Sequence, residues 1–405
     1  MKIALYYPWV YLPGGPERTI TEVLALSRHQ WHVFTNRYEP EATFPSLRNA
    51  DITEFDRVSV KRSFFPVAQA AWRIARQKVP LEGYDALVVF CEGLGDFLIF
   101  RNTSIPLICL CFTPLRAAFD GPYQERYLSA NRGRFWRKPI LAAGSAFYRA
   151  IDRWLWRKYH AVFAISREVR RRIVAGNLYP EEKIDLLYPG VDTRRLAPTG
   201  ASSLNFLVPG RIMWTKNLEL AIDAFRLLHE RRPDFSGFTL TIAGHVDRKS
   251  EKYYEMLQAR AAGCPQILFR TALSDENLFQ LLDSAYALVY PPFNEDWGLI
   301  PLEGMSFEKP VIAVNRGGPS ETVVDGESGL LVDPEPEKFA AAMEMFAGNP
   351  DLVRRMGKKA RVRALEFDWT CFCGRLDDAL DRLLVSRERP AAATALDGRP
   401  AVGNR

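Results

Sequence analysis

Two glutamates lie eight positions apart in the segment NEDWGLIPLEGM, which runs from Asn294 to Met305. Glu295 precedes a glycine, and Glu303 follows Pro301. Because proline is tolerated at the first position of a helix, a helix is expected to begin near Pro301. Glu303 would then lie in the first turn, where the helix end stabilises a carboxylate by about 0.3–1 kcal/mol. Such a carboxylate can accept hydrogen bonds from two neighbouring hydroxyls, as a ribose presents.

The turn before that helix supplies further groups for an oxygen-rich ligand. The backbone amides of Gly298, Leu299 and Ile300 are expected at the helix end, where the first amides have no acceptor inside the helix. They are therefore available to phosphate or sugar oxygens. Glu295 could reach a sugar attached beyond that phosphate. Two plainer interpretations stay open: Glu303 caps its own helix, and Glu295 is an exposed loop residue.

A pair of cations follows another predicted strand. The segment NFLVPGR (205–211) ends at Arg211, and Lys216 precedes a helix expected from Asn217. In an open parallel sheet, ligands bind beyond the carboxyl ends of the strands, and a helix N-terminus there favours an anion. Two cations at that place suit a diphosphate. The spacing alone also fits two solvated charges in a loop.

Two consecutive glycines, Gly14 and Gly15, follow the first apolar segment, KIALYYP (2–8). Apolar residues at helical spacing then run from Glu17 to Ser27, so the pattern predicts a strand, a glycine turn and a helix. Because glycine lacks a Cβ, this turn could line a binding cleft and let a ligand approach the backbone closely. An ordinary turn would need the same residues.

Short apolar segments alternate with helical stretches along the chain, which predicts an α/β protein. In the first half, segments of strand length occur at 2–8, 32–36, 86–90, 107–111 and 161–166. In the second half, they occur at 205–211, 239–244, 266–270, 287–292, 310–314 and 329–333. Continuous apolar runs are typical of parallel strands buried on both faces. Each half is therefore predicted to be a doubly wound, Rossmann-like domain.

The boundary between the two domains is expected just before the Pro- and Gly-bearing stretch APTGASS (197–203). We expect an N-terminal domain over 1–195, a C-terminal domain over 196–370, and a last helix over 371–386 that could cross back to the first domain. The segment 387–405 is rich in Ala, Pro and Gly and is predicted to be disordered. The cleft between two such domains is a common place for a small-molecule site.

The composition suits an anionic small molecule or an anionic membrane surface. The 405 residues include 54 basic and 48 acidic ones, for a formal charge of +6. No zinc-finger pattern or arginine-rich arm is present, so nucleic acid is not an expected partner. The six cysteines lack the spacing of a metal site, and no metal or other cofactor is expected. Neither a signal peptide nor an apolar stretch of about 18 residues is found, which predicts a cytoplasmic protein.

The segment 126–159 combines arginine and lysine with aromatic residues, and it contains a single acid. Basic residues attract anionic lipids, and aromatic side chains settle at the level of the headgroups. This segment is therefore predicted to bind the inner membrane surface, with Trp136, Arg137, Lys138 and Trp156 as contacts. The alternative is an amphipathic pair of helices packed on the domain core.

Three segments together resemble glycosyltransferase family 4: GGPERTI, GRIMWTKNLELAIDAF and PPFNEDWGLIPLEGMSFEKPVIAVNRGGPSETVVDGESGLLVDP. The likeness covers most of residues 1–385, is strongest from 205 to 335, and is especially similar to mannosyltransferases that extend lipid-linked oligosaccharides. It implies a GT-B fold, in which two Rossmann-like domains face an interdomain cleft. The C-terminal domain would hold the nucleotide sugar, and the N-terminal domain would hold the acceptor.

The resemblance also implies a role for each candidate residue. Arg211 and Lys216 would hold the diphosphate and, with Glu295, form the catalytic set. Glu303 would hold the ribose, and Glu295 the transferred sugar. The backbone of 298–300 would bind phosphate and sugar.

Gly14 and Gly15 would line the cleft from the opposite domain. Members of the family are retaining enzymes that use no bound metal. The function implied is transfer of a hexose, with mannose from GDP-mannose as the expected donor, onto a lipid-linked or polysaccharide-precursor glycan. The alternatives are a UDP-glucose or UDP-N-acetylglucosamine transferase of the same fold, and a nucleotide-sugar-binding protein without turnover.

One position departs from the family pattern. In LICLCFTPLRAAFD, this chain has Phe112 where relatives often carry a histidine near the transferred sugar. Its absence puts acceptor activation or donor choice in doubt, and the nearby Arg116 and Asp120 could compensate. Each of them could equally be a structural or surface charge. A lone histidine, His245, is interpreted as a loop residue.

Overall fold

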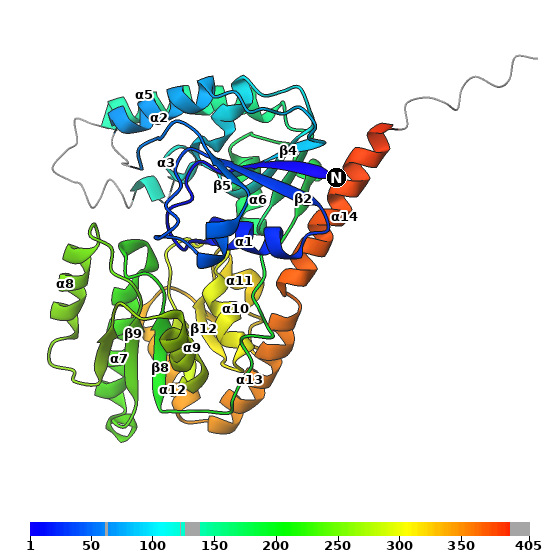
Figure 1. Ribbon diagram of the computed structural model, residues 1–405. Helices are drawn as coiled ribbons and strands as arrows, with labels where there is room; N and C mark the ends of the chain where they lie inside the picture. Colours follow the sequence, from blue (N-terminus) through cyan, green and yellow to red (C-terminus); the bar gives the residue numbers. More distant parts are fainter. Residues whose placement is uncertain (61–63, 122, 126–137, 389–405) are drawn as a thin grey trace, which may run out of the picture.

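The computed structural model describes residues 1–60, 64–121, 123–125 and 138–388 (Figure 1). Two domains lie one above the other, and each contains a parallel sheet with helices packed against it (Figure 1). One sheet has seven strands and the other has six, and every strand pair is parallel. The predicted α/β class with two Rossmann-like domains is confirmed.

The first domain contains the seven-stranded sheet, in the order β3-β2-β1-β4-β5-β6-β7. Its strands are β1 (Lys2–Tyr6), β2 (Gln30–Thr35), β3 (Ile52–Glu54), β4 (Ala86–Glu92), β5 (Leu107–Thr113), β6 (Ala161–Ala164) and β7 (Ile184–Leu186). Its helices include α1 (Gly15–Leu26), α2 (Phe64–Arg76), the 3₁₀ helix η2 (Leu94–Phe100), α3 (Arg116–Phe119), α5 (Lys138–Trp156) and α6 (Arg167–Ala175).

The second domain contains the six-stranded sheet, in the order β10-β9-β8-β11-β12-β13. Its strands are β8 (Asn205–Pro209), β9 (Thr239–Ala243), β10 (Ile267–Arg270), β11 (Ala287–Tyr290), β12 (Val311–Val314) and β13 (Gly329–Val332). Its helical segments include η5 (Trp214–Lys216), α7 (Leu218–Arg231), α8 (Glu251–Ala261), α9 (Asp275–Ser284), α10 (Leu299–Ser306), α11 (Pro319–Thr322), α12 (Pro336–Ala347) and α13 (Pro350–Leu365).

The strand orders place two switch points where sequence motifs lie. The chain moves outward from β1 to β3 and then returns to the other side of β1 with β4; β8 and β11 are related in the same way. Ligands of doubly wound sheets bind beyond the carboxyl ends of the strands at such a switch point. The segments after β8 and β11 contain Arg211, Lys216 and Glu295, so three candidate residues follow the switch point of the second sheet.

Two strands in the first sheet escaped the sequence prediction. β3 and β7 have three residues each and lie at the two edges of the sheet. Of their six residues only Ile184 is buried, so they lack the continuous apolar run of β4 and β5, in which nearly every residue is buried. A continuous apolar run indicates a strand that is covered on both faces. A short edge strand is less covered and can lack such a run.

The structure corrects two expectations for the membrane segment and the C-terminus. Trp156 is fully buried, so its predicted contact with a membrane is wrong. Trp136, Arg137, the side chain of Lys138 and the predicted tail from 389 onward lie outside the described residues. The last helix, α14 (Trp369–Glu388), is longer than the predicted 371–386 at both ends. Among the residues that the structure describes, no helix is both long and apolar enough to cross a membrane.

Helix α14 runs along the side of both domains and packs against α1 of the first domain (Figure 1). Asp377, which is buried, accepts hydrogen bonds from the Ser27 hydroxyl at 2.6 Å and from the Arg28 amide at 2.9 Å. The neighbouring Asp378 is exposed and pairs with the Arg28 guanidinium at 2.8 Å. The buried carboxylate of Asp377 is therefore the stronger tie between α14 and the first domain.

Replacement of Asp377 with alanine should lower the free energy of unfolding by about 1–3 kcal/mol, because it leaves a buried hydroxyl and amide without an acceptor. Asp378→Ala is the matched control and should change stability by no more than about 0.5 kcal/mol. Denaturation by urea, followed by circular dichroism, measures both. Equal midpoints for the two variants would contradict the assignment.

Candidate active site

Helix α10 begins two residues earlier than the sequence predicted. Gly298 is its N-cap, with φ 89°, a left-handed conformation that favours glycine, and Leu299 is its first residue. Glu303 therefore lies beyond the first turn, and the prediction that the helix end stabilises its carboxylate is wrong. The amides of Gly298, Leu299 and Ile300 have no hydrogen-bond acceptor among the described residues. They remain available to a ligand at the end of an eight-residue helix.

Lys216 and Glu295 form an ion pair, with 2.7 Å between Lys216 Nζ and Glu295 Oε2. Their side chains are 17% and 20% exposed, so Glu295 is not the exposed loop residue of the plainer interpretation. The Phe293 amide donates to the Thr215 carbonyl at 2.8 Å, which joins the loop after β11 to η5. The structure thus brings together two candidates that the sequence separates by 79 positions.

Arg211 is exposed, and its guanidinium makes no hydrogen bond or ion pair with the described residues. The exposure of Arg211 therefore fits the interpretation as a solvated charge. Its charge nevertheless acts on Glu17 of the first domain, where it lowers the pKa. Arg211 thus lies on the side of the second domain that faces the glycine turn.

Gly14 and Gly15 form the start of α1, as the N-cap and the first helical residue. A Cβ on Gly14 would lie 2.6 Å from Glu17 Oε2 and 2.7 Å from Leu12 Cδ1, so packing within the domain requires glycine there. A Cβ on Gly15 would meet nothing within 4 Å. Internal packing does not explain Gly15, and the open space beside it is available to a ligand.

Glu17 was not among the candidate site residues predicted from the sequence. Its side chain is buried, and neither carboxylate oxygen has a hydrogen-bond partner among the described residues. Burial raises its pKa to about 8, with a smaller contribution from Glu92, and the charge of Arg211 only partly offsets this. Glu92 itself accepts a hydrogen bond from the Tyr7 hydroxyl at 2.6 Å, just beyond the carboxyl ends of β1 and β4.

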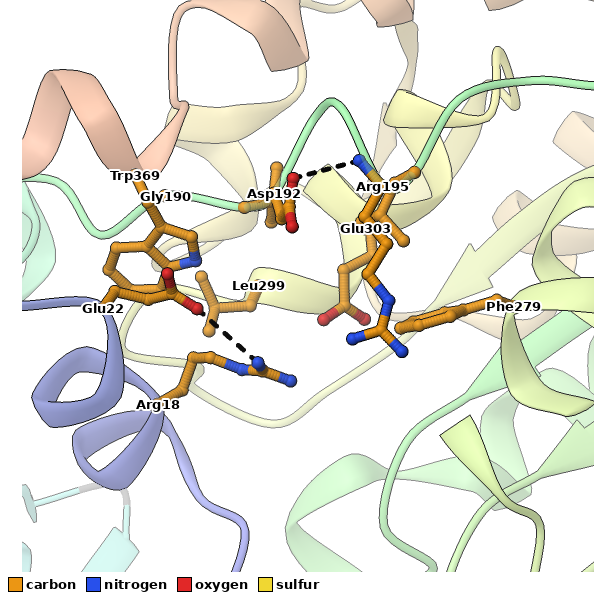
Figure 2. Close-up of a pocket in the computed structure, with 11 residues that line it drawn as sticks. Arg18, Glu22, Gly190, Asp192, Arg195, Phe279, Leu299, Glu303 and Trp369 are labelled. Atoms are coloured by element: carbon orange, nitrogen blue, oxygen red, sulfur yellow. Dashed lines mark hydrogen bonds and ion pairs between the residues drawn. The ribbon is translucent and has the colours of Figure 1, made fainter. Parts of the chain in front are cut away.

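Glu303 lines a pocket between the two domains (Figure 2). The first domain contributes Arg18 and Glu22 of α1, which form an ion pair at 3.6 Å. The other lining residues lie on the linker, on α9 and α10, and at the start of α14: Gly190, Val191, Asp192, Arg195, Leu196, Phe279, Leu299 and Trp369. Burial raises the pKa of Glu303 to about 7, against the opposing charge of Arg18.

Tyr290, the last residue of β11, lies near both Glu295 and Glu303. Its hydroxyl is buried, and burial followed by the charges of Glu295 and Glu303 raises its pKa well above the usual value. A Cβ on Gly298 would lie 3.1 Å from this hydroxyl. Glu295 and Glu303 therefore lie near one tyrosine, with Lys216 close to Glu295. The pocket itself is lined by Leu299 and Glu303 but not by Arg211, Lys216 or Glu295.

Arg116 and Asp120, which could compensate for the missing histidine, lie between the domains. Phe112 is buried and packs on Phe90, with 5.1 Å between ring centroids. Arg116 pairs with Asp296 at 2.6 Å, and Asp120 accepts from the Asn294 side chain at 2.7 Å. Both therefore contact the loop that carries Glu295 and are not surface charges. His245 is exposed, as expected of a loop residue.

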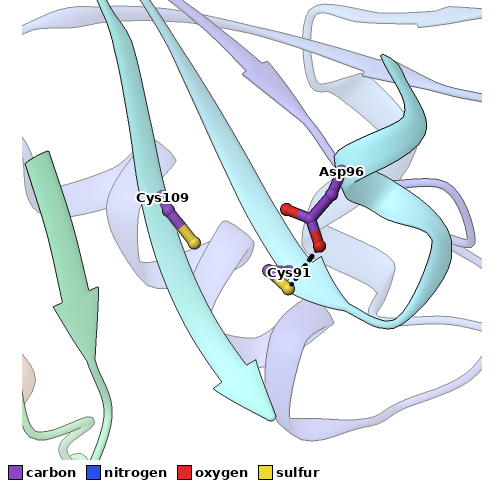
Figure 3. A group of neighbouring side chains, drawn as sticks. All are labelled: Cys91, Asp96 and Cys109. Atoms are coloured by element: carbon purple, nitrogen blue, oxygen red, sulfur yellow. Dashed lines mark hydrogen bonds between the residues drawn. The ribbon is translucent and has the colours of Figure 1, made fainter. Parts of the chain in front are cut away.

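One group of side chains in the first domain has the composition of a metal site. The ligand atoms of Cys91, Asp96 and Cys109 all lie within 4.8 Å of one another, beneath η2 (Figure 3). The Cys91 thiol donates to Asp96 at 2.9 Å, and the Tyr159 hydroxyl also donates to Asp96. Burial raises the pKa of Cys91 and of Asp96, whereas at Cys109 burial is outweighed by the interactions with the Cys111 and Cys91 thiols, which lower the pKa. Within the residues described, this group is a hydrogen-bonded part of the core.

Two family models match the chain. The model described as Glycosyltransferase Family 4 matches residues 13–195, and the model described as Glycosyl transferases group 1 matches residues 201–363. The first match covers the strands of the seven-stranded sheet except β1, and the second covers all six strands of the other sheet.

Several similar proteins are named α-1,3/1,6-mannosyltransferase ALG2. The mouse protein is 33% identical, over 75% of this chain and 75% of its own length. The Rhizomucor pusillus protein is 31% identical, over 98% and 95%. The human protein is 34% identical over about half of each chain, 50% and 53%.

Solved structures share the fold at low sequence identity. Anabaena HepE in complex with UDP and glucose has a TM-score of 0.70 at 15% identity, covering 94% of this chain and all of that one. Sucrose-phosphate synthase from Thermosynechococcus elongatus has a TM-score of 0.73 at 17% identity, covering 95% and 99%. These likenesses support the GT-B arrangement of two Rossmann-like domains.

Glu17→Gln should flatten the pH dependence of stability. Because the folded pKa of about 8 lies above the usual value of 4.5, the folded state binds more protons between these pH values. The free energy of unfolding therefore falls as pH rises from about 4.5 to 8, by about 1.4 kcal/mol per unit of pKa shift. The variant should gain stability relative to the wild type across this interval.

Denaturant midpoints from pH 4.5 to 9 measure this effect. Glu41→Gln is the control, because Glu41 is an exposed glutamate of the same domain. Parallel curves for Glu17→Gln and the wild type would show that the carboxylate is not desolvated.

Proposed function

We propose, on the premise that this chain belongs to glycosyltransferase family 4, that it transfers mannose from GDP-mannose to a lipid-linked or polysaccharide-precursor glycan. The names of the ALG2 relatives, 25% to 34% identical, support the choice of mannose. The second domain would bind the nucleotide sugar, and the first domain would bind the acceptor.

The observation that carries this proposal is the Lys216–Glu295 pair beside the free amides of α10. Breaking the bond between the anomeric carbon and the phosphate leaves a nucleoside diphosphate with growing negative charge. Lys216, Arg211 and the amides of 298–300 would stabilise that charge. Lys216 would then exchange its contact with Glu295 for a diphosphate oxygen.

Glu295, released from Lys216, would accept hydrogen bonds from the transferred sugar, and Glu303 would accept from the ribose hydroxyls. Gly15 would leave room for the diphosphate at the opposite wall. We assign the two glutamates to different parts of the donor. A glycosidase pair would need both carboxylates to flank one bond.

Retention of configuration at the anomeric carbon would follow if the acceptor hydroxyl attacks from the face that the diphosphate leaves. The leaving phosphate oxygen would then take the hydroxyl proton. Because Arg211, Lys216 and the helix end supply the positive charge, the reaction should not need a metal. Activity in excess EDTA should equal that in magnesium, and loss of turnover on chelation would contradict this.

GDP-mannose should be turned over in preference to UDP-glucose and UDP-N-acetylglucosamine, the runner-up donors. Release of GDP or UDP in the presence of a lipid-linked glycan acceptor measures this. Lys216→Ala should lower the rate by about 10²–10³-fold, the usual cost of one group that stabilises developing charge. Lys358→Ala, an exposed lysine on α13, is the matched control. Faster release of UDP than of GDP would contradict GDP-mannose as the donor and would favour UDP-glucose or UDP-N-acetylglucosamine.

We also propose that the enzyme is cytoplasmic and binds the membrane face through α2 and α5. Four exposed aromatic side chains lie on these helices: Phe65 is 82% exposed, Trp72 59%, Phe147 70% and Trp154 47%. On α5, the exposed Ala143, Phe147, Ala150 and Trp154 follow helical spacing and form one apolar face. Apolar faces of this kind in water are characteristic of interaction surfaces.

The charges on both helices favour an anionic bilayer. The described residues of α2 contain no acid, and the acid of α5, Asp152, is buried. Arg76 lies 4.7 Å from the ring centroid of Trp72, and Lys158, just beyond α5, lies 3.9 Å from that of Trp154. Both helices lie at the end of the first domain remote from the second domain (Figure 1). A bilayer there would leave the second domain in water.

Combined Trp72→Ser and Phe147→Ser substitutions should reduce binding to vesicles that contain anionic lipid, because they remove the aromatic anchors. Sedimentation with phosphatidylcholine–phosphatidylglycerol vesicles measures this. Val362→Ser and Leu365→Ser are the matched controls, since both remove exposed apolar residues from α13 of the second domain. Equal binding of all variants would disprove the proposed surface.

A further inference from the structure

The loop that carries Glu295 is held by two arginines of the first domain, on both sides of that residue. Arg116 Nη2 donates to the Asn294 carbonyl at 2.8 Å and to Asp296 Oδ2 at 2.6 Å. Arg172 pairs with the other carboxylate oxygen of Asp296 and donates to the Asn294 side-chain oxygen at 2.9 Å. The residues before and after Glu295 are therefore each bound by both arginines.

Two further polar groups of the first domain complete these contacts. Asp120 accepts from the Asn294 side-chain amide at 2.7 Å, and the Ser166 hydroxyl donates to the Asp296 carbonyl at 2.6 Å. Asn294 has φ 58°, a left-handed conformation that non-glycine residues adopt at a cost. The hydrogen bonds of its side chain and carbonyl hold it in that conformation. The backbone at Glu295 thus depends on contacts with the other domain.

These contacts involve charges that are out of water. The Arg172 side chain is 3% exposed. Burial alone would raise the pKa of Asp296, but the charges of Arg116 and Arg172 outweigh burial and hold the pKa below its usual value. If the domains separated, Asp296 would lose both arginines, and Arg116 would lose its ion pair with Asp296. Arg172, in contrast, would keep its pair with Glu168 at 2.9 Å. The arrangement is therefore specific to the docked state of the two domains.

Glu295 itself makes no contact of this kind with the first domain among the hydrogen bonds of the described residues. Its carboxylate pairs with Lys216, and its carbonyl accepts from the Gly318 amide at 3.0 Å. Both partners belong to the second domain. The first domain thus orients the residue through its neighbours and leaves its side chain for the ligand.

We propose that Arg116 and Arg172 are positioning residues for Glu295, so that Glu295 reaches its working position only while the two domains are docked. This inference rests on the proposed function, in which Glu295 contacts the transferred sugar. An undocked enzyme would still bind the nucleoside diphosphate through Arg211 and Lys216, but it would hold the sugar poorly. Contact with the sugar would thereby depend on the domain that binds the acceptor.

The test compares Asp296→Asn and Arg116→Gln with the wild type, using whichever nucleotide sugar the wild type turns over. Both variants should lower kcat by about 10²-fold, as a small misplacement of a catalytic group does. Affinity for the nucleoside diphosphate should change less than twofold, while affinity for the nucleotide sugar falls. Arg171→Gln is the control, an exposed arginine next to Arg172 on α6 that pairs with Glu168 and makes no contact with the loop of Glu295 among the described residues. Unchanged kcat, or equal losses of affinity for both ligands, would overturn the inference.

Two further variants separate positioning from a general loss of structure. Arg116→Lys keeps the charge and should recover part of the activity that Arg116→Gln loses. The double variant Asp296→Asn/Arg116→Gln should be no slower than the slower single variant, because both remove one interaction. Additive losses would contradict this. Absence of turnover in the wild type would instead refute the proposed function, and with it the premise of the inference.

Discussion

The partly buried carboxylate of Asp296, whose side chain is 23% exposed, is held between Arg116 and Arg172 and joins the two domains at the candidate site. A charge removed from water is tolerated only where partners and hydrogen bonds replace its hydration. Here the partners come from one domain and the carboxylate from the other. The relative position of the domains is therefore set beside Glu295, where the two domains would have to act together.

A second feature is the uneven distribution of charge across the cleft. On the second domain, Arg211 is unpaired among the described residues, and Lys216 is paired only with Glu295, beside the free amides of α10. On the first domain, burial keeps Glu17 largely protonated near neutral pH. A protonated Glu17 does not repel an anion that enters the cleft.

The strand order explains why both domains place polar residues at the cleft. In each sheet the strand order reverses at the switch point, and the carboxyl ends of the two central strands lie there. In the first domain, Tyr7 follows β1 and Glu92 is the last residue of β4; in the second, the segments after β8 and β11 contain Arg211, Lys216 and Glu295. Polar groups thus lie at the carboxyl ends of the strands, while the residues buried around each sheet form apolar cores.

The sequence by itself determined the α/β class, most of the strands and the position of Lys216 and Glu295 after two of them. Apolar runs reveal buried strands because burial on both faces leaves no room for polar residues. Sequence could not reveal Arg172, which lies in a run of three arginines, nor the burial of Glu17 or Trp156. It also placed the start of α10 at Pro301, although the turn at Gly298 sets it. Only the tertiary structure decided the ion pairs of Arg172 and the burial of Glu17 and Trp156, because ion pairing and burial depend on residues far apart in the sequence; Arg172 and Asp296, for example, are 124 positions apart.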